Sequence, residues 1–149
     1  GEKAVAARAP ESHTIVRSSW LFGTHGRCFP ATILRLAAER DELSVVDDQR
    51  GCPTFTGHLA NAVLELCRTQ PLGILHAAGA GGCSWHELAR EIVTRAGLDC
   101  EIKPCRTAEQ NRPAHRPAYS VLQSERPEAP RLPTWQQGLE EYMSVGLRS

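Results

Sequence analysis

The stretch VVDDQRGCPT, residues 45–54 of the 149, decides how this chain is organised. Val45 and Val46 are β-branched and indicate the end of a strand. Gly51 then permits backbone angles that are closed to other residues, and Pro53 fixes the direction of the chain. A loop at the carboxyl end of a strand is where α/β proteins usually bind a ligand. A tight strand-to-helix connection without a ligand is the simpler interpretation, and these residues alone leave both open.

Several groups in this loop are suited to holding a ligand. Gln49, Arg50 and Thr54 carry side-chain hydrogen-bond donors, and the backbone N–H groups around Gly51 add more. Such a mixed donor surface suits a sugar or a phosphate.

Helical and strand patterns alternate on both sides of the loop, which predicts an α/β fold. Apolar and β-branched runs predict strands at residues 13–23, 43–46, 73–78 and 100–104. Apolar spacing predicts helices at residues 1–8, 29–42, 56–70, 84–96 and from 134 onward. Along helix 56–70 the residues at helical spacing are Leu59, Ala60, Val63, Leu66 and Cys67. The proline-rich segment 106–133 is expected to form no long regular structure.

The glycines at positions 79, 81 and 82 lie between a predicted strand and a predicted helix, as in a dinucleotide-binding fingerprint. The third glycine of that fingerprint would fall at position 84, which is Ser84. Ser84 and Glu87 have the spacing of a capping box that begins a helix. We therefore favour a helix cap over a nucleotide site here.

Charge and cysteine content argue against several classes of protein. The chain has 17 basic and 17 acidic residues, so no global field draws it to nucleic acid or a membrane. Its six cysteines include no Cys-x-x-Cys pair, and Arg90 stands where a metalloprotease helix beginning at His86 needs a second His. We predict no metal site, and reduced structural thiols in a cytoplasmic protein.

Six short motifs stand out along the chain: GEKAV at 1–5, VRSSWLFG at 16–23, VDDQRGCPT at 46–54, SW at 84–85, RPA at 116–118 and LPTW at 132–135. Taken together, they resemble the carboxyl-terminal half of the dTDP-4-dehydrorhamnose reductase family, whose members are extended short-chain dehydrogenases/reductases. The motifs occur in the family's order and with its gaps.

This resemblance implies the carboxyl-terminal part of a Rossmann-like fold together with the family's small α/β substrate-binding domain. Residues 1–24 would be the tail of the helix that carries Tyr-x-x-x-Lys in the family, followed by a strand of the cofactor domain. Residues 25–149 would be mainly the sugar-nucleotide region, with segment 43–78 returning to the cofactor-domain sheet. Neither Tyr-x-x-x-Lys nor the family's amino-terminal Gly-rich loop occurs in these residues. We therefore expect a missing amino-terminal Rossmann half as partner.

In that bacterial family NADPH reduces the 4-keto group of dTDP-4-dehydro-L-rhamnose to give dTDP-L-rhamnose for polysaccharide biosynthesis. The resemblance implies an oxidoreductase that takes a dTDP-sugar and binds NADPH mainly through the absent half. This chain would carry no catalytic residue and would be inactive alone; a homodimer stays open. The alternatives are a non-catalytic regulatory or interaction relative, and a reductase or epimerase of another nucleotide sugar. Cys28 and Tyr119, which stand where the family usually has Asn, fit the non-catalytic alternative.

Site residues follow from the resemblance position by position. Trp20 matches a family tryptophan beside the sugar and nicotinamide, with a core aromatic as its alternative. Arg116 is assigned to the diphosphate, with a surface arginine as its alternative. The substrate-binding candidates are Trp20, Gln49, Gly51, Pro53, Thr54 and Arg116. The cofactor-binding candidates are Ser18 and Ser19.

Overall fold

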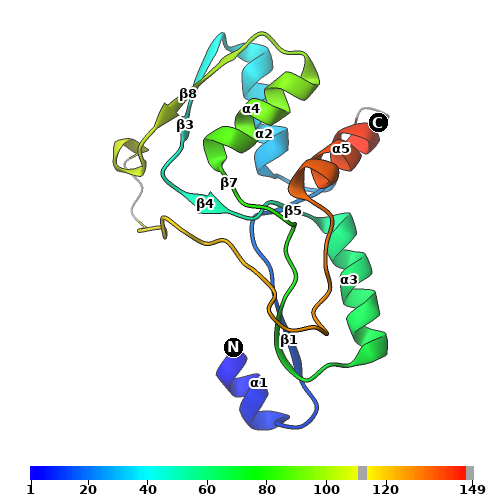
Figure 1. Cartoon of the computed structure of the whole chain (residues 1–149). Helices are drawn as coiled ribbons and strands as arrows, with labels where there is room; N and C mark the ends of the chain where they lie inside the picture. The colour runs from blue at the N-terminus through cyan, green and yellow to red at the C-terminus, as the bar shows by residue number, and fades with distance from the viewer. Residues whose placement is uncertain (111–113, 147–149) are drawn as a thin grey trace.

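The computed structural model describes residues 1–110 and 114–146, and it has the predicted α/β fold. Arg112 and Pro113 of the proline-rich segment lie outside the described residues. The elements form two lobes (Figure 1): α1, α3 and β1 lie in one, and α2, α4, α5, β3 and β8 lie in the other.

Each lobe contains one pair of parallel strands. In the first lobe β1 (Thr14–Arg17) pairs with β6 (Gly73–His76). In the second lobe β3 (Glu42–Val46) pairs with β8 (Glu101–Cys105). Parallel neighbours need a long crossover connection. The connection from β1 to β6 contains β3 of the second lobe, so the chain passes between the lobes more than once before either pair is complete.

Two short strand pairs hold the 45–54 loop where the lobes meet. β2 (Leu21–Phe22) runs parallel to β5 (Thr54–Phe55), and β4 (Arg50–Gly51) runs antiparallel to β7 (Cys83–Ser84). The backbone of the loop is therefore hydrogen-bonded to β2 at one point and to β7 at another.

The helices begin where the sequence signals predict. Pro30 lies in the first turn of α2 (Phe29–Glu39), where its missing N–H costs nothing. The Ser84 hydroxyl accepts the Glu87 N–H, and the Glu87 carboxylate accepts the Ser84 N–H, which confirms the capping box. The remaining helices are α1 (Glu2–Arg8), α3 (Thr56–Thr69), α4 (Trp85–Ala96), the short 3-10 turn η1 (Thr107–Gln110) and α5 (Trp135–Gly146).

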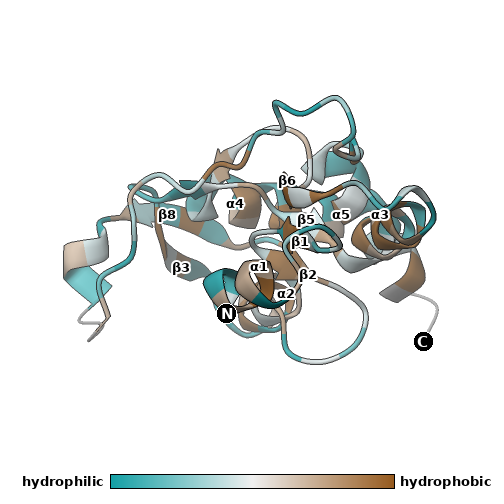
Figure 2. Cartoon of the chain, turned by 90° about the horizontal axis from the view of Figure 1, so that it is seen from below, coloured by the Kyte–Doolittle hydropathy of each residue, from teal (hydrophilic) through white to brown (hydrophobic). Residues whose placement is uncertain are grey.

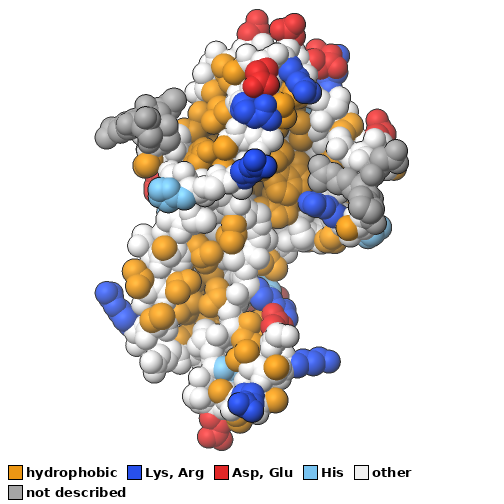
Figure 3. Space-filling model, turned by 180° about the vertical axis from the view of Figure 1, so that it is seen from behind, with side chains coloured by type: hydrophobic (Ala, Val, Ile, Leu, Met, Phe, Trp, Pro, Cys, Tyr) orange, Lys and Arg blue, Asp and Glu red, His pale blue; other side chains and the backbone are white. Residues whose placement is uncertain are grey.

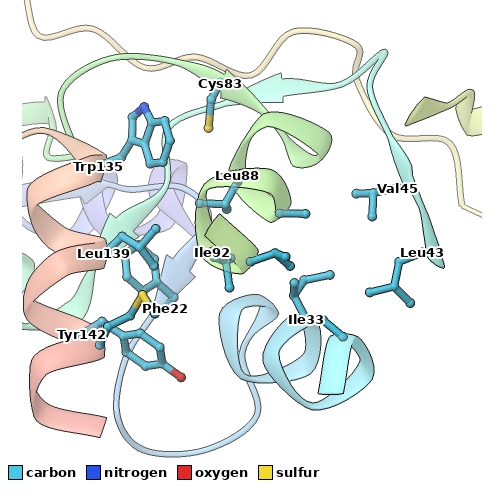
Figure 4. Close-up of a cluster of buried hydrophobic side chains, with 14 of the residues drawn as sticks. Phe22, Ile33, Leu43, Val45, Cys83, Leu88, Ile92, Trp135, Leu139 and Tyr142 are labelled. Atoms are coloured by element: carbon cyan, nitrogen blue, oxygen red, sulfur yellow. The ribbon is translucent and has the colours of Figure 1, made fainter. Parts of the chain in front are cut away.

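The main core lies between α2, α4 and α5 (Figure 4). Ile92 of α4 and Leu139 of α5 are completely buried. Trp135, Tyr142 and Met143 are buried as well, so α5 packs one apolar face against this core. Burial, and then the neighbouring Cys28 thiol, raises the pKa of Tyr142 to about 12.

The inner face of α3 differs from its predicted apolar face. The helix buries Ala62 and Leu66, whereas Ala60, Val63 and Cys67 are exposed. The sheet beneath α3 has only two strands in the described part of the chain, so it is too narrow to cover a wide apolar stripe. Figure 2 shows hydrophobic residues along α3 and around β1.

Within residues 1–110 and 114–146, no helix combines the length and the apolar character needed to cross a bilayer.

Ser84→Ala is expected to lower the free energy of unfolding by about 1–3 kcal/mol, because it removes a helix cap and a buried hydrogen bond. The Ser84 hydroxyl is fully buried and also donates to Asp47 Oδ1 at 2.5 Å. Urea denaturation measures the change. Ser144→Ala, which removes an exposed hydroxyl on α5, is the matched control and should change stability by less than about 0.5 kcal/mol. Equal stability of the two variants would contradict the structural role of Ser84.

Candidate functional site

A pocket of about 280 Å³ opens between α2, β3 and the start of α4. Seen from behind, hydrophobic side chains gather in a hollow in the same half of the molecule (Figure 3). Phe29 and Trp85 provide two aromatic rings, with centroids 4.6 Å apart and planes inclined by 51°. The pocket is lined by Phe29, Thr32, Ile33, Leu36, Ser44, Val45, Val46, Gln49, Trp85, Thr107, Gln110 and Arg116.

Gln49 forms part of the polar wall, and its amide is held in one orientation. Its Nε2 donates to Thr107 Oγ1 at 2.8 Å, and its Oε1 accepts from Trp85 Nε1 at 3.3 Å. The residue is only 7% exposed. A primary amide has two N–H donors and two acceptor lone pairs, so one of each remains for a ligand.

Thr107 is held in turn by Asp48. The Thr107 hydroxyl donates to Asp48 Oδ1 at 2.5 Å, and the Thr107 N–H donates to the same carboxylate at 3.0 Å. These two bonds hold the pKa of Asp48 below its ordinary value, the hydroxyl having the larger effect. A connected network therefore runs from Trp85 through Gln49 and Thr107 to Asp48.

Arg116 is exposed and is the one charged side chain among the described residues that line the pocket. Within the described part of the chain, its guanidinium forms neither an ion pair nor a hydrogen bond. A planar guanidinium can hold two oxygens of a phosphate at once. The pocket thus combines aromatic rings, amides and one positive charge.

Trp20 lies next to this pocket but does not line it. Its backbone is in the left-handed region, with φ +46°, a strained conformation for a bulky residue. Its ring stacks on Trp85, with centroids 3.5 Å apart and planes 6° from parallel. Gly51 makes room for the ring, since a Cβ there would lie 2.3 Å from Trp20 Cε2.

Pro53 and Thr54 are fully buried and lie outside the residues that line the pocket. The Thr54 hydroxyl donates to the Cys52 carbonyl at 3.2 Å and accepts the Gly79 N–H at 3.0 Å. Its hydrogen-bonding roles are therefore filled within the protein. In this structure Gly51, Pro53 and Thr54 shape the loop, while Gln49 and Arg116 reach the pocket.

Ser18 and Ser19 follow the carboxyl end of β1. The Ser19 hydroxyl donates to the Cys52 carbonyl at 2.9 Å. The Ser18 Oγ atom is buried, and within the described residues it has no hydrogen-bond partner. Because a buried polar group without a partner is costly, this atom is suited to a group that the described residues do not supply.

Trp85, Phe29 and Thr107 were not among the candidates named from the sequence. Only the SW motif pointed toward Trp85, and it did so as a family landmark. The described residues contain no group of three or more His, Cys, Asp or Glu side chains that could hold a metal ion.

Comparison with known proteins gives consistent matches. Residues 1–147 match the family described as RmlD substrate binding domain. The dTDP-4-dehydrorhamnose reductase of Streptomyces griseus is 42% identical over 132 residues, covering 85% of this chain and 43% of that protein.

Two solved structures are also similar to this chain. The dTDP-4-dehydrorhamnose reductase ortholog of Clostridium acetobutylicum has a TM-score of 0.92 and 39% identity, covering 99% of this chain and 53% of that one. The Bacillus anthracis reductase, in complex with NADP, has a TM-score of 0.85 and 37% identity, covering 89% of this chain and 48% of that one. The chain spans about half the length of the relatives it matches.

Thr54→Val is expected to lower the free energy of unfolding by about 1–3 kcal/mol, because it leaves the buried Gly79 N–H without an acceptor. Thermal or urea denaturation measures the loss. Thr69→Val, at an exposed position near the end of α3, is the matched control. A Thr54→Val protein of normal stability that no longer bound nucleotide would show instead that Thr54 contacts the ligand.

Proposed function

Because this chain belongs to the RmlD substrate binding domain family, we propose that it is the sugar-nucleotide-binding half of an NADPH-dependent dTDP-4-dehydrorhamnose reductase. The enzyme would reduce the 4-keto group of dTDP-4-dehydro-L-rhamnose and release dTDP-L-rhamnose. The observation that carries the proposal is the pocket in which Phe29, Trp85, Gln49 and Arg116 meet. The relatives described above are named as reductases, which favours this function over a non-catalytic interaction module.

The chemistry of the pocket suits a pyrimidine nucleoside diphosphate. An aromatic wall offers a stacking surface for the base. Thymine has two carbonyl oxygens and one ring N–H, which can pair with the amides of Gln49 and Gln110. Arg116 supplies the charge-assisted donors that a diphosphate needs.

The sugar end of the substrate is assigned to the neighbourhood of Trp20. The strained backbone of Trp20 is a feature that concentrates at functional sites. The Trp20 ring also stacks on Trp85, which lines the pocket. Ser18 and Ser19 lie just before it in the sequence, at the carboxyl end of β1, where α/β proteins bind ligands.

NADPH, when bound, supplies the hydride for such a reduction. The buried Ser18 hydroxyl, which has no partner among the described residues, fits a hydrogen bond to the cofactor. Ser19 is committed to the Cys52 carbonyl and would position the loop beside it. The role of this chain is therefore to bind the sugar nucleotide and to complete one side of the cofactor site.

The domain assignment also implies a partner surface. Among the described residues β1 pairs only with β6, so its other edge is free for a further strand. Beside it lies a pocket of about 790 Å³ whose lining includes Val16, Val63 and Leu72. We assign residues 1–24 to the cofactor-domain sheet. Of segment 43–78, which was expected to return to that sheet, we keep only β6, because β6 pairs with β1 whereas β3 pairs with β8 in the other lobe. We expect the amino-terminal Rossmann half of the enzyme to pair with β1. Association of two copies of this chain would be a competing use of the surface, which sedimentation would reveal.

A cytoplasmic location is part of the same proposal. All six cysteines are free thiols, as a reducing compartment would keep them. Cys52 and Cys83 are buried, and burial raises the pKa of the Cys83 thiol to about 12.

The 149 residues of this chain by themselves are expected not to bind NADPH with micromolar affinity, because they contain neither a Tyr-x-x-x-Lys pair nor the family's Gly-rich cofactor loop. Isothermal titration calorimetry with NADPH tests this. Micromolar binding would contradict the assignment of the cofactor site to the other half of the enzyme.

Arg116→Ala is expected to weaken dTDP binding by about 1.5–3 kcal/mol, the range for hydrogen bonds to charged groups. Arg116→Lys should recover only part of this loss, because an ammonium cannot reproduce the two-pronged contact. Calorimetric titration with dTDP measures both variants.

Arg90→Ala is the matched control, since Arg90 is an exposed arginine on α4 that does not line the pocket. Its dTDP affinity should equal that of the unmodified protein. Equal affinity in all four proteins would remove Arg116 from the site.

A further inference from the structure

Trp85 occupies the boundary between the pocket and Trp20. It lines the pocket beside Phe29, and it also stacks on Trp20 at 3.5 Å. Trp20 itself does not line the pocket. Any effect of a pocket ligand on Trp20 therefore has Trp85 as its most direct route.

The orientation of Trp85 depends on residues that the same ligand would touch. Its indole N–H donates to Gln49 Oε1, and the Gln49 amide is held by Thr107. Gln49, Thr107 and Trp85 all line the pocket. A ligand that pairs with Gln49 therefore acts on the residue that, among the described residues, accepts the Trp85 indole N–H.

The conformation of Trp20 depends on its neighbours and is expected to change if the Trp85 ring moves. Its φ of +46° is unfavourable for a tryptophan and must be held by its surroundings. The restraints are the Trp85 ring, the close approach to Gly51, and the Trp20 carbonyl, which accepts the Thr54 N–H at 3.1 Å. Only the Trp85 ring belongs to the pocket.

We propose that Trp85 is a positioning residue that couples occupancy of the pocket to the orientation of Trp20. Nucleotide bound against Gln49 and Trp85 shifts the indole stack, and the Trp20 ring is thereby placed for the sugar. Gln49 acts through Trp85 in this coupling. The inference rests on the proposed function, which makes a dTDP-sugar the occupant of the pocket.

The stack has a spectroscopic signature of its own. Two stacked indoles at this distance couple their electronic transitions, and a twist between the two transition moments within the stack produces an exciton couplet in far-ultraviolet circular dichroism. Among the described residues Trp135 forms no stack with either of them. Trp20→Phe and Trp85→Phe should each abolish the couplet, whereas Trp135→Phe should retain it. A couplet that survives Trp85→Phe would overturn the proposal.

The coupling is tested by titrating the protein with dTDP while recording circular dichroism and calorimetric heat in parallel. The couplet is expected to change with the same midpoint as the heat. Gln49→Met, which removes the acceptor for the Trp85 N–H, should weaken the couplet before any ligand is added. Gln49→Glu, which keeps an acceptor for Trp85 but loses the donor to Thr107, should restore it in part. This pair of variants carries the test if Trp85→Phe fails to fold.

The outcomes separate the coupling from the function. Heat of dTDP binding with an unchanged couplet would overturn the coupling and leave the proposed function in place. No heat of dTDP binding would overturn the proposed function, and the coupling with it. A couplet in Gln49→Met as strong as in the unmodified protein would overturn the role of Gln49 in orienting Trp85.

Discussion

The hydrogen bonds of the buried residue Thr54 are the constraint on which the rest of this structure depends. The Thr54 backbone N–H donates to the carbonyl of Trp20. The Thr54 side-chain hydroxyl donates to the carbonyl of Cys52 and accepts the N–H of Gly79. Three segments that are distant in sequence are thereby joined at one fully buried residue. Because unpaired backbone groups are costly in a buried setting, none of these bonds can be lost without a penalty.

This constraint explains how a tryptophan comes to lie in a left-handed backbone conformation. The Trp20 carbonyl is held by Thr54, and the pairing of β2 with β5 fixes the chain direction directly after Trp20. The Trp20 ring then lies over Gly51 and stacks on Trp85. The strain at Trp20 is thus supported by hydrogen bonds in the loop and by stacking across the site.

The pocket contains polar groups of two kinds: some are held by hydrogen bonds within the protein, and one is exposed to solvent. Gln49 and Thr107 are held in a hydrogen-bonded network that ends on Asp48, so they present their remaining donors and acceptors in a fixed direction. Arg116 comes from an irregular segment and is exposed. A rigid polar wall suits recognition of a base, while an exposed guanidinium suits a charged group that enters from solvent.

The sequence by itself determined the local structure, the family and several positions of the candidate site. Pro30, the capping box at Ser84 and the apolar face of α5 were readable because each depends on residues only a few positions apart. Only the tertiary structure decided which side chains of the loop line the pocket. The Thr54 side chain is buried and the Gln49 side chain lines the pocket, although both belong to one motif. The reason is that their hydrogen-bond partners, Gly79 and Thr107, lie far away in the chain. The exposed face of α3 and the stack of Trp20 on Trp85 have the same cause, since both depend on how distant elements pack against one another.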